Sequence, residues 1–303
     1  MGDMHAGGKE AHPSRLDPKL DIVFWMLFGA EQNRALLISL LNAVLGPMAP
    51  IESAEVLHAQ PERTGVDDKS IALDVRVRLA SGEQVDVEMQ SQRRPAQRAR
   101  ALYYWARLYA GQLQRGAPYT ELRRCVVVLI TSFAELPSPR FHSVFRVQER
   151  HASEPLTDHL ELHLVELPKL REETMDRNDE PALTAWGRFL AASADDDLET
   201  LAMEHPVLKQ ATDALERLSA NQEARLRAEQ REMALISYEL DLSVARREGR
   251  AEGKANLLQH QLAIKFGQLA PSVAERVAVA GEVELDRWSE RVLSADTLES
   301  VFA

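Results

Sequence analysis

Cysteine and long apolar runs are the features that this chain most clearly lacks. It has 303 residues and one cysteine, Cys125, so an intrachain disulfide is excluded and a cysteine-based zinc site is not expected. No run of 18 apolar residues occurs, so no membrane span is expected. The N-terminus shows no apolar segment of the kind that a signal peptide needs, and we expect a cytoplasmic protein without a membrane partner.

Positive charge is outnumbered over the whole chain, with 36 basic against 47 acidic residues. The net charge of −11 argues against a general nucleic-acid coat. Between residues 93 and 124, however, there are eight arginines and a single acid, Glu121. Such a patch is able to hold phosphate groups, but a solvated helix face would have the same composition. With 45% hydrophobic and 27% charged residues, the chain has enough apolar material for a core.

The spacing of apolar residues predicts an α/β fold with a mixed sheet. In chain order, the elements are helices at 17–28 and 33–45, strands near 51–57, 70–79 and 84–90, a helix at about 95–115, a buried strand at 125–130, and strands at 144–148 and 160–166. This is an α-β-β-β-α-β order. The helix at 95–115 is expected to have Leu102, Ala106, Tyr109 and Leu113 on one face.

Composition divides the chain into four parts. Residues 1–15 resemble a disordered leader, and 16–180 carry the α/β domain. Residues 181–255 form a helical linker or coiled coil, and 256–303 a small helical module. Gly249 and Gly253 permit either the close approach of another helix or a hinge. We expect homo-oligomers through these C-terminal helices.

The register of the hairpin at 70–90 follows from its apolar alternation. A two-residue turn at 81–82 would pair Val75 with Glu88 and mix the two faces. A three-residue turn at 80–82 instead places Val75 opposite Val87 and puts Gly82 where a left-handed residue is favoured. This register is therefore predicted, and it sets Asp74 opposite Glu88.

Two directly opposed carboxylates repel each other, because their β-carbons are only about 4.5–5.5 Å apart. A shared proton or a cation offsets the repulsion. Oxygen ligands suit a hard ion such as Mg²⁺, which also binds phosphate oxygens. The pattern alone fits a solvent-facing hairpin with scattered charges at least as well. The histidines at 58, 142 and 163 have no ligand spacing, and surface or core roles are expected for them.

Several segments in order resemble the Rpn family of recombination-promoting nucleases and putative transposases, a branch of the PD-(D/E)xK nuclease superfamily. The segment at 73–90 reads LDVRVRLASGEQVDVEMQ, and it is flanked by DIVF at 21–24, LFG at 27–29, LLNAVL at 40–45 and RALYYW at 100–105. The resemblance covers about residues 16–170 and also extends to the helical tail. Where the family usually has lysine in its opening motif, this chain has Trp25.

The resemblance implies a restriction-endonuclease-like core that binds Mg²⁺ or Mn²⁺ and hydrolyses DNA. Asp74 and Glu88 would be metal ligands together with the Met89 carbonyl, and Gln90 would replace the lysine that orients the attacking water. Asp21 would be either an accessory acid or a plain surface residue. Arg98, Arg100 and Arg107 are candidates for contacts with the DNA backbone.

Two functions therefore compete. The first is a metal-dependent DNA endonuclease linked to recombination or mobile elements. The second is a degenerate nuclease scaffold that binds DNA or protein without catalysis. The intact set of Asp74, Glu88 and Gln90 favours the first, whereas Trp25 and the acidic net charge favour the second.

Overall fold

The computed structural model describes residues 15–57, 75–170, 181–192 and 195–303. These residues form a first compact unit that ends at Glu232 and a second that begins at Met233. Residues 1–14 of the predicted leader lie outside the described residues. Asp74 lies outside them as well.

The first unit is built on a six-stranded mixed sheet. Its strands are β1 (Ala54–Val56), β2 (Val75–Leu79), β3 (Gln84–Gln90), β4 (Cys125–Thr131), β5 (His142–Arg146) and β6 (Leu160–Glu166). The order across the sheet is β1-β2-β3-β4-β6-β5. The β3–β4 and β4–β6 pairs are parallel, and the other pairs are antiparallel. The predicted α/β class with a mixed sheet is confirmed.

The β2–β3 hairpin has the register expected from its apolar pattern. Val75 lies opposite Val87, and Val77 lies opposite Val85. The turn has three residues, since the Leu79 amide donates to the Glu83 carbonyl at 2.9 Å. Gly82 has a φ of 86°, a left-handed conformation that glycine adopts without the steric cost of a β-carbon. The apolar pairs therefore set the register.

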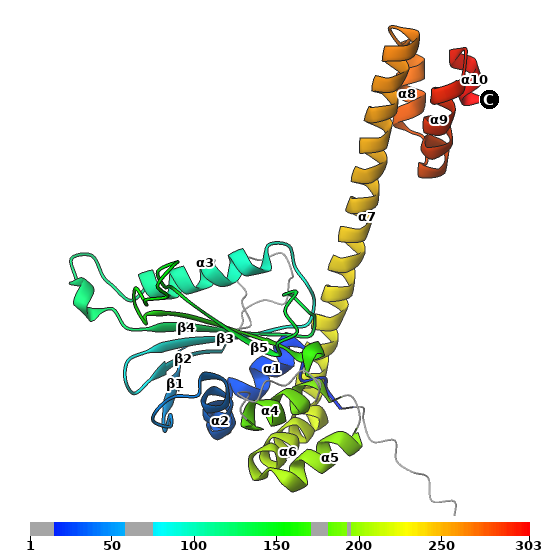
Figure 1. Ribbon diagram of the computed structural model, residues 1–303. Coiled ribbons are helices and arrows are strands. Elements are labelled where there is room, and N and C mark those ends of the chain that lie inside the picture. Colours follow the sequence, from blue (N-terminus) through cyan, green and yellow to red (C-terminus); the bar gives the residue numbers. More distant parts are fainter. Residues whose placement is uncertain (1–14, 58–74, 171–180, 193–194) are drawn as a thin grey trace, which may run out of the picture. The chain divides into compact units, whose positions relative to one another are not determined.

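Helices cover both faces of the sheet (Figure 1). The face with the hairpin valines packs against α1 (Asp21–Phe28), α2 (Arg34–Leu45) and α4 (Pro181–Ala191) in one shared core. The opposite face lies under α3 (Gln97–Ala110), which packs mainly on β4. The polar row of β3 points to this second face, so helix α3 shields it from solvent.

The apolar residues expected on one face of α3 are not the ones that it buries most deeply. Leu102 and Ala106 are exposed, whereas Gln97 and Ala101 are buried. The indole of Trp105 donates to the Cys125 carbonyl at 3.0 Å. This packing fits the sheet beneath α3, whose polar part suits small and hydrogen-bonding side chains better than leucine.

Helices α4, α5 (Asp195–Glu204) and α6 (Pro206–Ala220) belong to the first unit. Trp186 and Phe189 of α4 are fully buried in its core, and the Trp186 indole donates to Ser39 of α2 at 3.2 Å. A β-carbon at Gly187 would lie 2.6 Å from the ring of Phe141, so only glycine fits there. The boundary drawn near residue 180 from composition thus falls inside this unit.

The second unit has its own small core. It contains most of α7 (Gln222–Phe266) with α8 (Pro271–Ala278), α9 (Glu282–Ser294) and α10 (Leu298–Phe302). Leu258 and Leu262 pack with Leu285, Trp288 and Val301.

Short 3-10 helices of the first unit lie at Glu31–Asn33, Tyr119–Glu121 and Leu167–Lys169. Among the described residues, no helix combines the length and apolarity needed to cross a bilayer.

Candidate functional site

Glu88 and Gln90 lie next to each other at the end of β3, on the face that α3 covers. Their exposed fractions are 5% and 7%. The Gln90 side-chain amide donates a hydrogen bond to the Glu88 carboxylate. Asp86, two residues earlier, is also buried and faces Arg76, with 3.8 Å between Oδ1 and Nε. Burial of charged groups is costly unless they are paired, so this polar row requires a balancing set of partners.

The predicted partner of Glu88, Asp74, lies outside the described residues. The pair Val75–Val87 is the last one described on that side of the hairpin, so the pairing of Asp74 with Glu88 stays a prediction. Met89 has its side chain fully buried in the core, and only its backbone is available as a ligand. Within the described ranges, no three acidic, histidine or cysteine side chains gather as a metal site.

The chemistry of Glu88 and Gln90 fits part of a divalent-metal site. A buried carboxylate oriented by an amide is a fixed oxygen ligand of the kind that hard cations prefer. One carboxylate does not bind such an ion by itself, so the fit depends on a second acid. That second acid is the role predicted for Asp74.

The chain that leaves β3 is fixed by the end of β4. The Ser132 amide donates to the Gln90 carbonyl at 3.0 Å, and its hydroxyl donates to the Ser91 carbonyl at 2.7 Å. Arg93 donates to the Ala134 carbonyl and lies over the ring of Phe133 at 5.5 Å. The segment after Gln90 therefore has a defined path toward Arg94.

Asp21 forms a buried ion pair with Arg231 of α7. The Arg231 Nε atom lies 2.9 Å from Oδ1 and 3.1 Å from Oδ2, and Nη2 lies 2.5 Å from Oδ2. The Ile22 amide also donates to Oδ1 at 2.8 Å. The exposed fractions of Asp21 and Arg231 are 7% and 3%, so the surface role considered for Asp21 is wrong.

Arg94 is half-buried. Burial lowers the pKa of Arg94, and the positive charges of Arg100 and Arg231 lower it further, whereas Asp21 and Glu88 raise it. Arg94 thus interacts electrostatically with both carboxylates. Sequence reasoning placed Arg94 only in the arginine-rich patch at 93–124, for which phosphate binding and a solvated helix face were both open, and it assigned no role to Arg231.

The three arginines predicted to contact DNA lie on or beside α3. Arg98 donates to the Glu135 carboxylate at 2.8 Å. Arg100 donates to the Tyr104 hydroxyl at 2.7 Å, and Arg107 lies 5.9 Å from the ring centroid of Tyr103. Arg98 and Arg107 are exposed. Their contact with DNA stays a prediction.

A separate buried chain of polar groups joins β5 and β6. His142 Nε2 lies 2.9 Å from His163 Nδ1, and His163 Nε2 lies 2.7 Å from Glu161 Oε1. Arg124 and Arg146 also bind Glu161, at 2.9 and 2.7 Å. Burial and the neighbouring His163 lower the pKa of His142 to about 4. The two histidines are 21 residues apart, so spacing gave no sign of this contact, which only the strand pairing creates.

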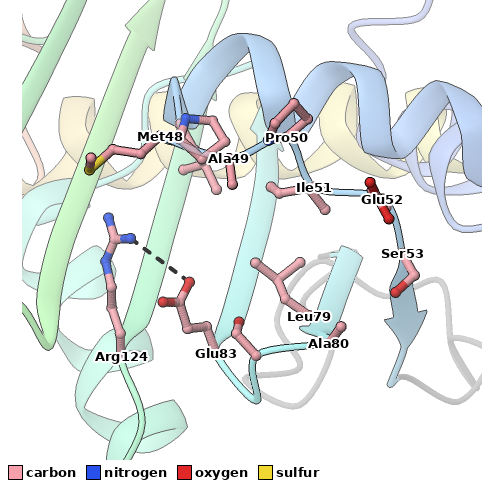
Figure 2. A pocket seen from close by; sticks show the side chains of 13 residues that line it. Met48, Ala49, Pro50, Ile51, Glu52, Ser53, Leu79, Ala80, Glu83 and Arg124 are labelled. Atoms are coloured by element: carbon pink, nitrogen blue, oxygen red, sulfur yellow. Dashed lines mark ion pairs between the residues drawn. The ribbon is translucent and has the colours of Figure 1, made fainter.

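A pocket of about 570 Å³ lies near the opposite end of β3, beside the hairpin turn (Figure 2). Its lining includes Met48, Leu79, Glu83 and Arg124, and Arg124 lies 3.8 Å from Glu83. Gln84 and Gln90 are the two ends of β3, roughly 20 Å apart at about 3.3 Å per residue. The pocket is therefore not part of the Glu88 site.

Trp25, which stands where the Rpn resemblance leads one to expect lysine, is partly buried and packs against the main core.

A family model described as PD-(D/E)XK nuclease family transposase matches residues 18–245. No curated protein and no solved structure gives a match. The matched range includes the β2–β3 hairpin, α1 with Asp21, and the half of α7 that carries Arg231.

Proposed function

The chain belongs to the PD-(D/E)XK nuclease family transposases, and from this premise we propose that it is a metal-dependent DNA endonuclease of the Rpn branch. Glu88 and Asp74 hold the metal with the Met89 carbonyl, and Mg²⁺ or Mn²⁺ is the ion. Self-association through the C-terminal helices and a role in recombination belong to the same proposal. The observation that carries it is the buried Glu88 carboxylate, bound by the Gln90 amide, at the end of a central strand.

In this proposal, the chemistry of each side chain sets its role. A bound divalent cation would activate a water molecule and reduce the negative charge of the scissile phosphate. Glu88 offers an oxygen ligand whose direction is fixed by Gln90. The Gln90 amide is also able to orient a water molecule, but it is neutral and adds no positive charge. Asp21 is occupied by Arg231 and does not serve as a metal ligand in this proposal.

A substitution at Glu88 tests the proposal. Glu88→Gln keeps the size of the side chain and removes the charge, so it should abolish Mg²⁺-dependent nicking of plasmid DNA with little change in the melting temperature of the apo protein. The wild type should melt at a higher temperature with Mg²⁺ or Mn²⁺, because the ion binds the folded state, and Glu88→Gln should lose this shift. Asp74→Ala should behave in the same way.

Glu83→Gln is the matched control, since Glu83 lies in the same hairpin but beside the turn, facing Arg124 at 3.8 Å. It should cleave like the wild type. If Glu88→Gln cleaves at the wild-type rate, the metal site is elsewhere or a contaminant is responsible. If the wild type binds DNA and never cleaves it, the non-catalytic scaffold is the better description.

A further inference from the structure

The pocket beside the β2–β3 turn has the size and the fixed walls of a small-molecule site. Its volume is about 570 Å³, and small ligands usually occupy roughly 300–1,000 Å³. One wall is the segment 45–53 that follows α2, and the other is the hairpin turn with Arg124 (Figure 2). The Asn42 side chain fixes the first wall, since it accepts from the Ile51 amide at 2.7 Å and donates to the Ile51 carbonyl at 3.0 Å. This wall therefore has its shape before any ligand binds.

Most of the lining is apolar. Met48, Pro50 and Ile51 come from the 45–53 segment, and Leu79 comes from the end of β2. Met48 is fully exposed, and its flexible thioether is able to adapt to an apolar ligand. Contact with these side chains removes apolar surface of a ligand from water, which favours binding. A ligand that matches this lining therefore has an apolar body.

The charges of the lining are unbalanced. The lining has two carboxylates, Glu52 and Glu83, and one cation, Arg124. Arg124 Nη2 lies 2.9 Å from the buried Glu161, whereas its Nη1 lies 3.8 Å from Glu83, which is too far for a hydrogen bond. Within the described parts of the chain, the Glu83 carboxylate accepts no hydrogen bond and Glu52 has no charged partner. The pocket therefore offers carboxylate acceptors that are not used.

These features decide between three kinds of ligand. An anion would meet two carboxylates and an arginine that already binds Glu161. A purely apolar ligand would cover Glu83 and separate its charge from water without a partner, which is costly. An ammonium group carries a positive charge and three hydrogen-bond donors, so it satisfies the free acceptors of Glu83. Only an amine with an apolar body suits both the charge and the walls of the pocket.

We propose that this pocket binds a small primary amine in its ammonium form, with the ammonium on the Glu83 carboxylate and the aliphatic chain against Met48 and Leu79. Glu52 is exposed and adds a weaker attraction. The site goes beyond the nuclease function and does not rest on it, because it lies at the opposite end of β3 from Glu88.

The first test compares ligands on the full chain by isothermal titration calorimetry, without DNA or metal. n-Hexylamine, which is protonated at pH 7.5 as lysine is, should bind saturably with one site per chain. 1-Hexanol and hexanoate have the same chain without the positive charge and should bind at least about tenfold more weakly. From butylamine to hexylamine, each added methylene should strengthen binding by about two- to fourfold, because the chain is buried in the apolar lining.

The second test compares variants that each remove one negative charge. Glu83→Gln should weaken the binding of n-hexylamine by about tenfold, because it removes the direct charged acceptor. Glu52→Gln should weaken it by only about two- to fivefold, since that carboxylate is exposed. Glu31→Gln is the matched control. Glu31 is also on the first unit but outside the lining, with its side chain 92% exposed, and this variant should bind like the wild type.

The outcomes separate this site from the proposed nuclease. Absence of saturable binding of n-hexylamine overturns the inference, and so does equal binding of 1-hexanol. Tighter binding of hexanoate would make Arg124 the binding group of an anion site and also overturns it. Equal losses in Glu83→Gln and Glu31→Gln would mean attraction by net charge alone. A wild type that binds n-hexylamine as expected and never cleaves DNA would support this inference while the nuclease proposal fails.

Discussion

Glu88 on β3 and Arg231 on α7 are both charged, and both are almost inaccessible to solvent, but for different reasons. Glu88 is buried because strand alternation points it to a face of the sheet that α3 covers. Arg231 is buried in a helical stripe with Ala224, Ala228 and Leu235, whose spacings of four, three and four residues are those of one helix face. The first position can be derived from its neighbours in the sequence. The second depends on Asp21, which is 210 residues away.

This difference has a consequence for stability. Strand β3 is held by backbone pairing with β2 and with β4, so it does not need the charge of Glu88 to stay in place. Arg231 and Asp21 need each other, since without the other each would lose its direct ion-pair partner inside the first unit. The comparison therefore predicts that charge removal at Arg231 affects folding and that charge removal at Glu88 affects chemistry.

The largest expected effect is that of Arg231→Ala. Removing one partner of a buried ion pair destabilises a protein by about 3–5 kcal/mol, because the other buried charge loses its ion-pair partner. Urea unfolding of the first unit should show this loss as a lower midpoint. Arg227→Ala, at an exposed pair on the same helix, should change the free energy of unfolding by less than about 0.5 kcal/mol. Equal midpoints for the two variants would mean that Asp21 has another partner.

Much of the first unit could be predicted because its strands obey local rules. The valines of β2 and β3 led to the correct register, and the apolar run at Cys125 was correctly predicted as a strand covered on both faces. The buried face of α3 was not predictable in this way, since it depends on the polar surface beneath it. The same is true of the position of Arg231, because nothing near it in the sequence points to Asp21.

The candidate site was predicted only in part for the same reason. Glu88 and Gln90 came from a strand pattern and a resemblance, and the structure places them side by side. The polar chain at Glu161 depends on contacts between segments distant in sequence. Asp74 remains a prediction, because it lies outside the described residues.

A second prediction concerns pH and the chain His142–His163–Glu161, a buried polar cluster that lies apart from both residues of the comparison. The folded-state pKa of His142 is lowered from 6.5 to about 4. Between pH 6.5 and 4 the unfolded state binds more protons than the folded state. The free energy of unfolding therefore decreases as the pH falls from 6.5 toward 4. The loss attributable to His142 should be on the order of 2–3 kcal/mol.

The matched variant for that measurement is His142→Gln. Its amide can still donate to His163 Nδ1, but it does not titrate, so the slope of unfolding free energy against pH should become smaller between pH 6.5 and 4.5. Below pH 4.5 Glu161 contributes as well, because its bonds to His163 and Arg146 and its charged neighbours hold its pKa at about 2 despite opposing burial. An unchanged slope in His142→Gln, beside His151→Gln as a surface control, would contradict the prediction.

A third prediction compares the two faces of β3 directly. Val87→Ala removes two methyl groups from the core and should cost about 2 kcal/mol in the free energy of unfolding. Glu88→Gln, one residue further on, should cost less than about 1 kcal/mol because the amide keeps the shape and can still bond to Gln90. Chemical unfolding of both variants in the absence of metal measures the difference. A larger loss in Glu88→Gln would mean that Glu88 is chiefly structural.

The smallest effect on folding is expected from removal of the second unit. A chain ending at residue 245 keeps Arg231 and all the buried residues of the first unit, which ends at Glu232. Its urea midpoint should therefore match that of the first transition of the full chain. A chain ending at residue 221 lacks Arg231 together with the buried Ala224 and Ala228, so its midpoint should fall at least as far as in Arg231→Ala.

The chain ending at residue 245 also tests the proposed self-association. Beyond residue 245, Gly249 and Gly253 have open space where a β-carbon would be, and the second unit supplies further helical surface. Light scattering should show a smaller assembly for the chain ending at residue 245 than for the full chain. If both have the same stoichiometry, the C-terminal helices do not drive association. If the shorter chain also melts at a lower denaturant concentration, the second unit stabilises the first, and the stability of the Asp21–Arg231 pair then depends on more of α7 than its buried stripe.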